Sequence, residues 1–277
     1  MSELKKVLIT VKTYPTLSKK YDELVCTAGI LEDSSWIRIY PLPFRKLDYD
    51  TRYNKYQWIE VPLEKNKSDP RPESYRPTNI DKIKLLDTIT TKDDWSERRK
   101  VIINKGKAYT NLTKLIEKAK KNELSLATFK PSKILDLTIE ETDRDWPKDK
   151  LDLLKLKSKQ LDLFQTLEEI EKEFSIVPKL PYKFSYKFTD DKGQKSTLMI
   201  EDWEIGALYW NCLKSSNWDE KAASEKVKDK YFREFSNRDL YLFLGTTQRH
   251  HFTAPNPFVI IGVFYPPFIT QPNLFDF

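Results

Sequence analysis

The chain has 277 residues, enough for one large domain or two ordinary ones, and its 39% hydrophobic and 13% aromatic content excludes an intrinsically disordered protein. Its formal net charge of +6 and pI near 8.9 favour polyanionic partners without establishing one. Two widely separated cysteines, Cys26 and Cys212, argue against a disulfide framework or a zinc ribbon. With no long apolar run at the start of the chain, these features predict a cytoplasmic protein that neither spans nor binds a membrane.

Residues 1–90 are predicted to form a small, mostly β, barrel-like domain. Segments rich in Val and Ile predict strands at 6–11, 23–31, 36–40 and 57–63, and the polar residues 32–35 predict a hairpin turn. Alternation along the third strand places Ile37 and Ile39 in the core and Trp36, Arg38 and Tyr40 on the other face. Three prolines fall within residues 69–77, so we expect that segment to be extended but not regular.

Residues 91–177 are predicted to form a helical middle segment. Asp94 and Glu97 match a capping box that opens a helix reaching about residue 104, and an apolar face predicts a second helix over 112–121. A short strand is expected at 134–139, followed by the longest helical pattern of the chain at 148–174.

Residues 178–268 are predicted to form a C-terminal part with a mixed sheet and helices. A hairpin is expected from 182–188 and 196–200, followed by a helix opening at Asp202, a helix at 220–235, and two strands around a polar loop. Four aromatic residues alternate along the first hairpin strand and could stack bases, although packing against a helix is the simpler interpretation. The whole chain is therefore predicted to be α+β.

Candidate catalytic residues come from two places. Asp202 and Glu204, at a helix start, could act as general bases or magnesium ligands, although capping is the simpler role for Asp202. His250, beside His251 and Arg249, could donate a proton or help to grip a phosphate, unless the loop is merely solvated. Because the sequence has no phosphate loop, nucleophile elbow or metal-ligand spacing, we expect no metal and no cofactor, with Mg²⁺ needed only by a nuclease.

Candidate nucleic-acid contacts lie at strand ends, on the proline-rich segment and in the polar loop. Arginine, lysine and tyrosine side chains on extended segments suit phosphate contacts and base stacking, and aromatic residues at one rim could wall a nucleobase pocket. Tyr-Pro pairs at strand ends can also be purely structural. The candidates are Lys12, Tyr14, Arg38, Tyr40, Arg45, Arg71, Tyr75 and Arg249.

The last seven residues, 271–277, carry the most specific motif. Gln271, Leu274 and Phe277 have the spacing of a glutamine and two apolar anchors on a short helical turn, and the peptide resembles the PCNA-interacting motif. Gln271, Leu274 and Phe275 also fit the bacterial clamp-binding peptide, although Asp276 interrupts the usual double aromatic. The resemblance implies a sliding clamp as partner and a role in DNA metabolism. The alternative is an apolar tail packed on its own domain.

Three further motifs, KTYP at 12–15, WIRIYP at 36–41 and YPP at 265–267, resemble signatures of an uncharacterised prokaryotic family from DNA-related contexts. This resemblance implies no catalytic residues. The sequence therefore predicts a clamp-recruited protein that acts on damaged or modified DNA in repair or phage defence. A DNA glycosylase is preferred over a nuclease, for which no Pro-Asp…Glu-x-Lys pattern is present. The alternatives are a non-catalytic PUA-like or OB-like reader of single strands or modified bases, and a nucleotide or small-molecule hydrolase.

Overall fold

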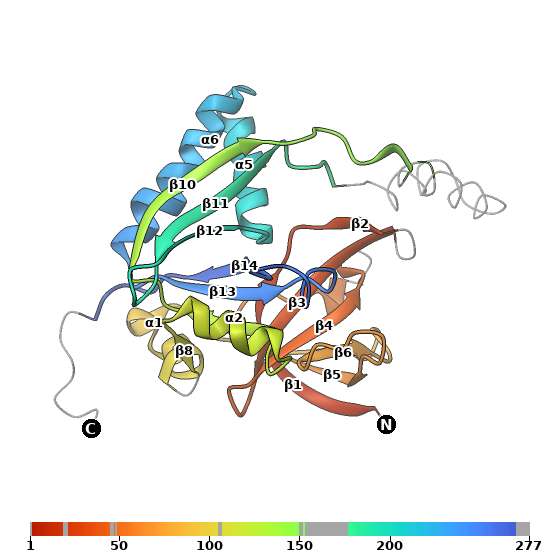
Figure 1. Cartoon of the computed structure of the whole chain (residues 1–277). Coiled ribbons are helices and arrows are strands. Elements are labelled where there is room, and N and C mark those ends of the chain that lie inside the picture. Colours follow the sequence, from red (N-terminus) through yellow and green to blue (C-terminus); the bar gives the residue numbers. More distant parts are fainter. Residues whose placement is uncertain are drawn as a thin grey trace.

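The computed structural model describes residues 2–18, 22–44, 47, 49–104, 107–149, 152 and 177–269. It has the predicted α+β class: a β-barrel forms one part, and two further sheets with helices form the other (Figure 1). The helix predicted at 148–174, apart from residues 148, 149 and 152, lies outside the described residues. So do Arg45 and the peptide 271–277 with Gln271, Leu274, Phe275 and Phe277.

Five strands close the N-terminal barrel, as expected for residues 1–90. They are β1 (Glu3–Lys12), β3 (Asp22–Leu31), β4 (Trp36–Leu42), β6 (Ser74–Pro77) and β5 (Gln57–Lys65), paired in this order. Pairing of β1 with β5 completes the ring, so its central strands have no free edge. β2 (Thr16–Ser18) extends β3, and β7 (Lys84–Thr88) pairs with β5 outside the ring. Ile37, Ile39 and Val61 lie inside the barrel with the other apolar residues of its core.

The proline-rich segment 69–77 is more regular than predicted, because it contains β6. Pro70 and Pro72 precede the strand and Pro77 ends it, so the prolines withhold no hydrogen bond from the strand interior. β6 pairs in parallel with β4 through Ser74 opposite Arg38, and antiparallel with β5. The expectation that this stretch is irregular is therefore wrong, and the segment joins two sides of the barrel.

The middle of the chain supplies strands as well as the predicted helices. α2 (Leu112–Lys120) is capped by Asn111, whose Oδ1 accepts from the Lys114 N–H at 2.9 Å. α1 (Lys92–Arg99) leads into the π-helical turn η3 (Lys100–Asn104) without the expected capping box, because Asp94 has a left-handed φ of 52° inside the helix. β8 (Ala108–Tyr109), β9 (Leu126–Phe129) and β10 (Lys133–Glu141) pair with each other or with C-terminal strands, so this segment is not a separate helical unit.

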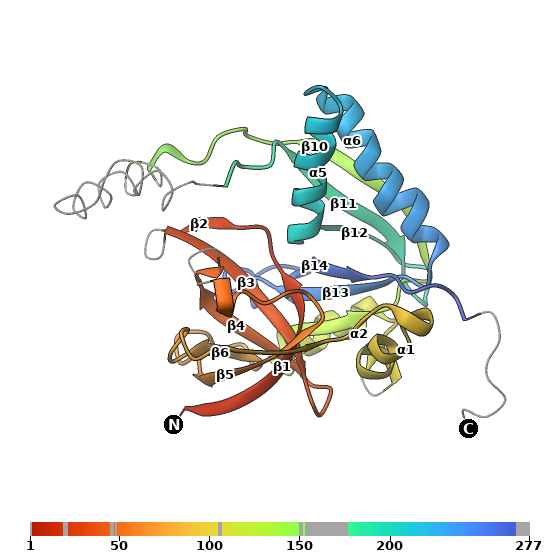
Figure 2. The same ribbon diagram turned by 180° about the vertical axis from the view of Figure 1, so that it is seen from behind.

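Two sheets organise the C-terminal part. One has the order β10-β11-β12 and the other β14-β13-β9-β8. The new elements are β11 (Tyr182–Thr189), β12 (Lys195–Met199), α5 (Trp203–Ser215), α6 (Glu220–Lys228), η4 (Asp229–Glu234), η5 (Phe235–Asn237), β13 (Tyr241–Thr246) and β14 (Phe258–Phe264). α5 and α6 cover one face of the first sheet (Figure 2). Phe184, Tyr186 and Phe188 of β11 are buried there with Tyr209 and Tyr231, which confirms the core interpretation of the aromatic strand.

A third apolar cluster joins the barrel to the β13–β14 hairpin. Val11 and Ile30 of the barrel pack with Phe243, Ile261 and Phe264 of the hairpin. The two parts therefore share buried apolar surface, whose removal from water stabilises their arrangement. None of the helices within the described residues is long and apolar enough to cross a bilayer.

Candidate functional site

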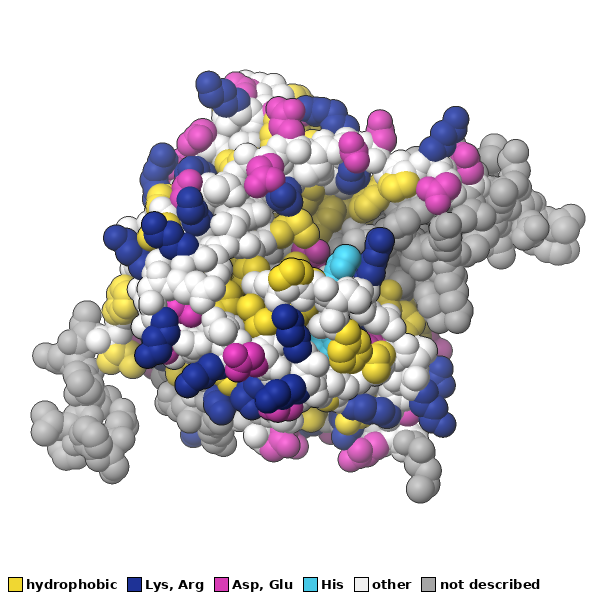
Figure 3. Space-filling model, in the orientation of Figure 1, with side chains coloured by type: hydrophobic (Ala, Val, Ile, Leu, Met, Phe, Trp, Pro, Cys, Tyr) yellow, Lys and Arg dark blue, Asp and Glu magenta, His cyan; other side chains and the backbone are white. Residues whose placement is uncertain are grey.

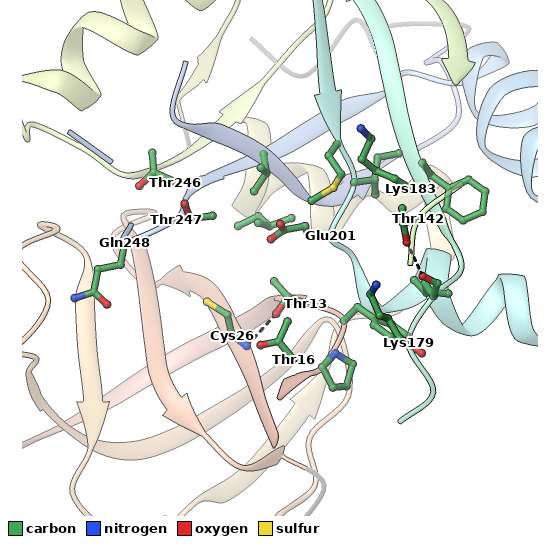
Figure 4. Close-up of a pocket in the computed structure, with 18 of the residues that line it drawn as sticks. Thr13, Thr16, Cys26, Thr142, Lys179, Lys183, Glu201, Thr246, Thr247 and Gln248 are labelled. Atoms are coloured by element: carbon green, nitrogen blue, oxygen red, sulfur yellow. Dashed lines mark hydrogen bonds between the residues drawn. The ribbon is translucent and has the colours of Figure 1, made fainter. Parts of the chain in front are cut away.

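A cavity of about 600 Å³ lies where the barrel meets the C-terminal sheets. One wall comes from the end of β1 and from β3 and β4, and the other comes from β11, the end of β12 and the β13–β14 hairpin (Figure 4). The aromatic residues lining it are Tyr14, Tyr40, Trp146, Tyr182 and Phe184. This volume is in the range of small-molecule sites, and the lining combines apolar walls with a small number of polar groups, as such sites do.

Glu201 is the acidic residue among those that line this cavity. Its backbone is fixed on both sides, because its N–H donates to the Ile260 carbonyl at 2.7 Å and its carbonyl accepts from the Tyr14 N–H at 2.8 Å. Its carboxylate lies beside the open space (Figure 4) and accepts no hydrogen bond from the residues that the structure describes. Burial raises its pKa above the ordinary value. This carboxyl group is thus available to bond a ligand or to exchange a proton with one.

Cys26 lies on the barrel wall, and Figure 4 shows its thiol and the Glu201 carboxylate on opposite sides of the cavity. The Cys26 N–H donates to Thr13 Oγ1 at 3.0 Å, which ties β3 to the end of β1. Burial raises the pKa of the thiol, although the positive charges of Arg38 and Arg71 oppose this shift. The group therefore stays a neutral thiol at physiological pH and is a weak nucleophile.

Arg38 and Arg71, two of the predicted phosphate contacts, are buried at the inner end of the cavity. Arg38 is 2% exposed and donates to Ser125 Oγ at 2.7 Å and to the Thr246 carbonyl at 3.3 Å. Arg71 forms a bidentate ion pair with Asp69, in which Nε donates to Oδ1 at 2.8 Å and Nη2 donates to Oδ2 at 2.6 Å. It also donates to the Thr246 carbonyl. Their donors are committed to internal acceptors, so these arginines hold the barrel to β13 and are not presented on the surface.

The other predicted nucleic-acid residues are scattered. Tyr14 and Tyr40 line the cavity. The Lys12 ammonium instead lies 4.5 Å from the centre of the Phe44 ring, and Lys65 lies over Tyr75 on the barrel. Arg249 is exposed on the loop after β13, whereas Arg45 is outside the described residues. The cavity thus brings together Tyr14 and Tyr40 but neither Lys12 nor Tyr75.

Asp202 and Glu204 do not line the cavity; they lie with Lys55 on the other side of the extended chain. Asp202 Oδ1 accepts from the Glu204 N–H at 3.3 Å, which confirms that Asp202 caps α5. Lys55 Nζ lies 2.6 Å from Glu204 Oε2 but 3.7 Å from Asp202 Oδ2. Burial raises the pKa of Asp202 to about 6, against the opposing charge of Lys55. Successive residues of extended backbone point to opposite sides, which separates Asp202 from Glu201.

The two histidines have different environments. His250 is exposed, whereas His251 is fully buried with both ring nitrogens bonded. Asn122 uses its amide N–H to bond Pro70, so its Oδ1 accepts from His251 Nε2 at 3.0 Å. His251 Nδ1 then accepts from Thr246 Oγ1 at 2.9 Å, which defines a neutral ring. Burial lowers the pKa of His251, and the charges of Arg71 and Arg38 lower it further, so His251 has a structural role.

Charges on the face shown in Figure 3 are mixed, with Lys and Arg side chains interspersed with Asp and Glu. A second hollow of about 890 Å³ lies between β7 and α1, and its lining also mixes positive and negative side chains. It is lined by Lys6, Lys92 and Lys100 and by Glu60, Asp87, Asp93 and Glu97, and Trp58 forms part of its wall. Within the described ranges, His, Cys, Asp and Glu side chains form no group of three that could hold a metal ion. The cavity beside Glu201 remains the best-defined candidate site.

Sequence reasoning selected Asp202 and Glu204 but not the adjacent Glu201, and it did not select Cys26, Thr247 or Gln248. Alternation on the extended chain indicates that Glu201 and Asp202 face opposite sides, so it could have kept Glu201 as a candidate. It does not indicate which side is hollow. Cys26 and the two loop residues carry no local signal for a site, because the walls they face come from distant parts of the chain.

Two family descriptions match the chain. Residues 3–104 match a domain of unknown function, DUF8758, and residues 106–277 match a domain of unknown function, DUF8757, which spans more than half of the chain. The boundary falls between η3 and β8, so α1 belongs with the barrel and the rest with the C-terminal part. The cavity is lined by residues of both domains. No curated protein matches the chain.

Proposed function

We propose that this chain, which belongs to the family defined by the domain of unknown function DUF8757, is a DNA-processing protein that holds an extruded nucleobase in the cavity beside Glu201. The observation that carries the proposal is a half-buried carboxyl group, unpaired within the described residues, in a cavity with aromatic walls. Proteins that act on a base take it out of the stack, hold it against aromatic or apolar side chains and read its edge through hydrogen bonds. The net charge of +6 favours a polyanionic ligand.

The lining residues support a nucleotide-sized ligand. Tyr14, Tyr40 and Tyr182 provide aromatic surface for a base, and Thr13 and Thr247 provide hydroxyl groups that can donate or accept hydrogen bonds. Lys179 and Lys183 lie at the edge of the cavity and pair with exposed carboxylates. Lys179 Nζ is 3.8 Å from Asp143 Oδ2 and also donates to the Asp143 carbonyl, and Lys183 Nζ is 2.5 Å from Glu140. Such surface pairs contribute little, so a phosphate group can replace these partners.

Glu201 is suited to cleavage of the bond between the base and the sugar. In this reaction Glu201 takes a proton from water as the water oxygen bonds to C1′ of the sugar. The bond from C1′ to the base nitrogen breaks, its electron pair leaves with the base, and the base takes up a proton. The raised pKa of Glu201 makes its carboxylate a stronger base than an exposed glutamate.

Labelled duplexes that each carry one damaged or modified base provide the test. Incubation followed by alkali should produce strand breaks at the modified base with the wild-type protein. Glu201→Gln should lower the cleavage rate at least 100-fold, the lower end of the effect expected for a general acid–base residue. The matched control is Glu117→Gln, since Glu117 is an exposed glutamate on α2 away from the cavity. Equal rates for wild type and Glu201→Gln would refute the catalytic role.

A modified-base reader is the second candidate, because the closed five-stranded barrel beside the cavity belongs to a class of small barrels that often bind nucleic acid. A reader would bind one of the modified duplexes without producing alkali-labile sites. Its affinity would still depend on Glu201 as a hydrogen-bond acceptor. If no duplex or strand binds at any salt concentration, the nucleic-acid proposal is wrong and a small-molecule ligand should be sought for the cavity.

A further inference from the structure

The loop between β13 and β14 begins at the cavity and then projects from it. Thr247 and Gln248, its first residues, line the cavity. Arg249, His250 and Phe252 follow and are exposed, and the Phe252 side chain is 52% exposed despite its apolar ring. The loop thus carries an exposed phenylalanine four residues after Gln248, the last loop residue that lines the proposed base pocket, and three residues after Arg249.

The root of this loop is held by contacts to the barrel and to the turn that follows α2. The buried His251 bonds Thr246 at 2.9 Å and Asn122 at 3.0 Å, and Gln248 Nε2 donates to the Ser68 carbonyl at 2.8 Å. Within the loop, the Ala254 N–H donates to the His250 carbonyl at 3.1 Å. These bonds leave few alternatives for the backbone around Phe252. The exposed ring is therefore presented on a well-defined turn and not on a free segment.

The Phe252 ring is oriented by its neighbour. It packs edge-on against the buried His251 ring, with centroids 4.5 Å apart and planes at 71°. Because His251 is itself fixed, this contact restricts the directions that the phenylalanine can take. A single exposed ring differs from an apolar patch of the kind that binds another protein.

On the basis of the proposed function, we infer that Phe252 inserts into the base stack of a duplex and fills the space left by the base that enters the cavity. Apolar wedges on proteins that distort DNA act in this way by separating adjacent base steps. Arg249 supplies the cation for a phosphate beside the opened step. The inference assigns the loop a role in opening duplex DNA that is separate from holding the base.

The test compares a duplex with a single strand, because only the duplex must be opened. The probe is a duplex with 2-aminopurine opposite a mismatched base, together with the same 2-aminopurine strand alone. Wild-type protein should raise the fluorescence of the duplex as the analogue leaves the stack. Phe252→Ala should weaken duplex binding at least fivefold and abolish this rise, while binding of the single strand changes less than twofold. Phe252→Leu should restore most of the rise, because leucine is also an apolar wedge.

Phe268→Ala is the matched control. Phe268 is 57% exposed, but it follows the end of β14 that pairs with Tyr241, whereas the loop joins the end that pairs with Thr246. It should behave as wild type. Arg249→Gln should lower the slope of log affinity against log salt by about one for the duplex, the value of one phosphate contact.

The outcomes separate the wedge from the function on which it rests. Suppose that Glu201→Gln weakens binding of both the duplex and the single strand, whereas Phe252→Ala binds and unstacks the duplex like wild type. The proposed base pocket is then supported and the wedge is refuted. If Phe252→Ala weakens binding of the duplex and of the single strand equally, the wedge is also refuted, because Phe252 would then be an ordinary contact residue. If wild-type protein binds neither ligand, both proposals fail together.

Discussion

The buried ion pair between Asp69 and Arg71 gives the most quantitative prediction. Asp69 is 3% exposed, and its carboxylate accepts from Arg71 at 2.8 and 2.6 Å and from Ser74 Oγ at 2.5 Å. Burial alone would raise the pKa of Asp69, but the bonds from Arg71 and Ser74 outweigh it and lower the pKa from 3.8 to about 2. At about 1.4 kcal/mol per pH unit, this difference corresponds to about 2.5 kcal/mol of stability.

The sign of the pH dependence follows from the lowered pKa. The folded protein binds this proton less readily than the unfolded chain does, so the contribution is fully present above about pH 4 and is lost as the pH falls toward 2. Asp69→Asn replaces the carboxylate by a neutral group of the same shape. We therefore expect the variant to lose about 2.5 kcal/mol at pH 7 and to approach the wild type as the pH falls toward 2.

Urea unfolding followed by tryptophan fluorescence at pH 7, 5 and 3 measures these differences. Asp81→Asn, at an exposed aspartate, should change the free energy of unfolding by less than about 0.5 kcal/mol at each pH. The reasoning is refuted if Asp69→Asn is as stable as this control at pH 7. It is also refuted if the loss is the same at all three pH values, since a constant loss would come from packing and not from charge.

Three further predictions concern the core, the acid cluster and the tail. Tyr186→Phe removes a buried bond to the Tyr231 carbonyl and should cost about 1 kcal/mol in urea unfolding, with no change in binding of nucleic acid. Asp202→Asn should keep the α5 cap and, because the pKa of Asp202 is raised to about 6, should increase stability at pH 7 relative to wild type but not below pH 4. Thermal unfolding at the two pH values measures the sign of this stability change. A loss of stability at pH 7 would show that the contact between Asp202 and Lys55 dominates. Deletion of residues 271–277 should eliminate co-purification with the host sliding clamp while leaving the melting temperature unchanged. A calorimetric titration of the isolated peptide that shows no heat would contradict the clamp resemblance.

Local patterns predicted most strands and helices that lie within the described residues. The alternation over 182–188 predicted a strand with one aromatic face, and β11 has this arrangement because the adjacent helices bury that face. The helices predicted to open at Asp202 and at residue 220 are present as α5 and α6, and in the structure Asp202 and Asp219 cap their starts. The turn at Asp93–Trp95 was missed, since positive φ angles at three non-glycine residues give no periodic signal.

Arg38 shows why the sequence alone could not predict which basic residues lie on the surface. An arginine on the second face of a strand is most often exposed, so it was expected at a rim. In the structure Ser125 and Thr246, which are 87 and 208 residues away, accept its hydrogen bonds. No local pattern reports such partners. The burial of Arg38 depends on how the C-terminal sheet closes over the barrel.

The sequence by itself determined the periodicity of the strands, the caps of α2, α5 and α6, and the opposite orientations of Glu201 and Asp202. These features depend on neighbours within a few residues, through backbone geometry and local hydrogen bonds. Only the tertiary structure decided that Glu201 faces a cavity and that Asp202 faces Lys55. The reason is that both surroundings are assembled from strands distant in the chain, and the buried apolar surface that holds those strands together is non-directional.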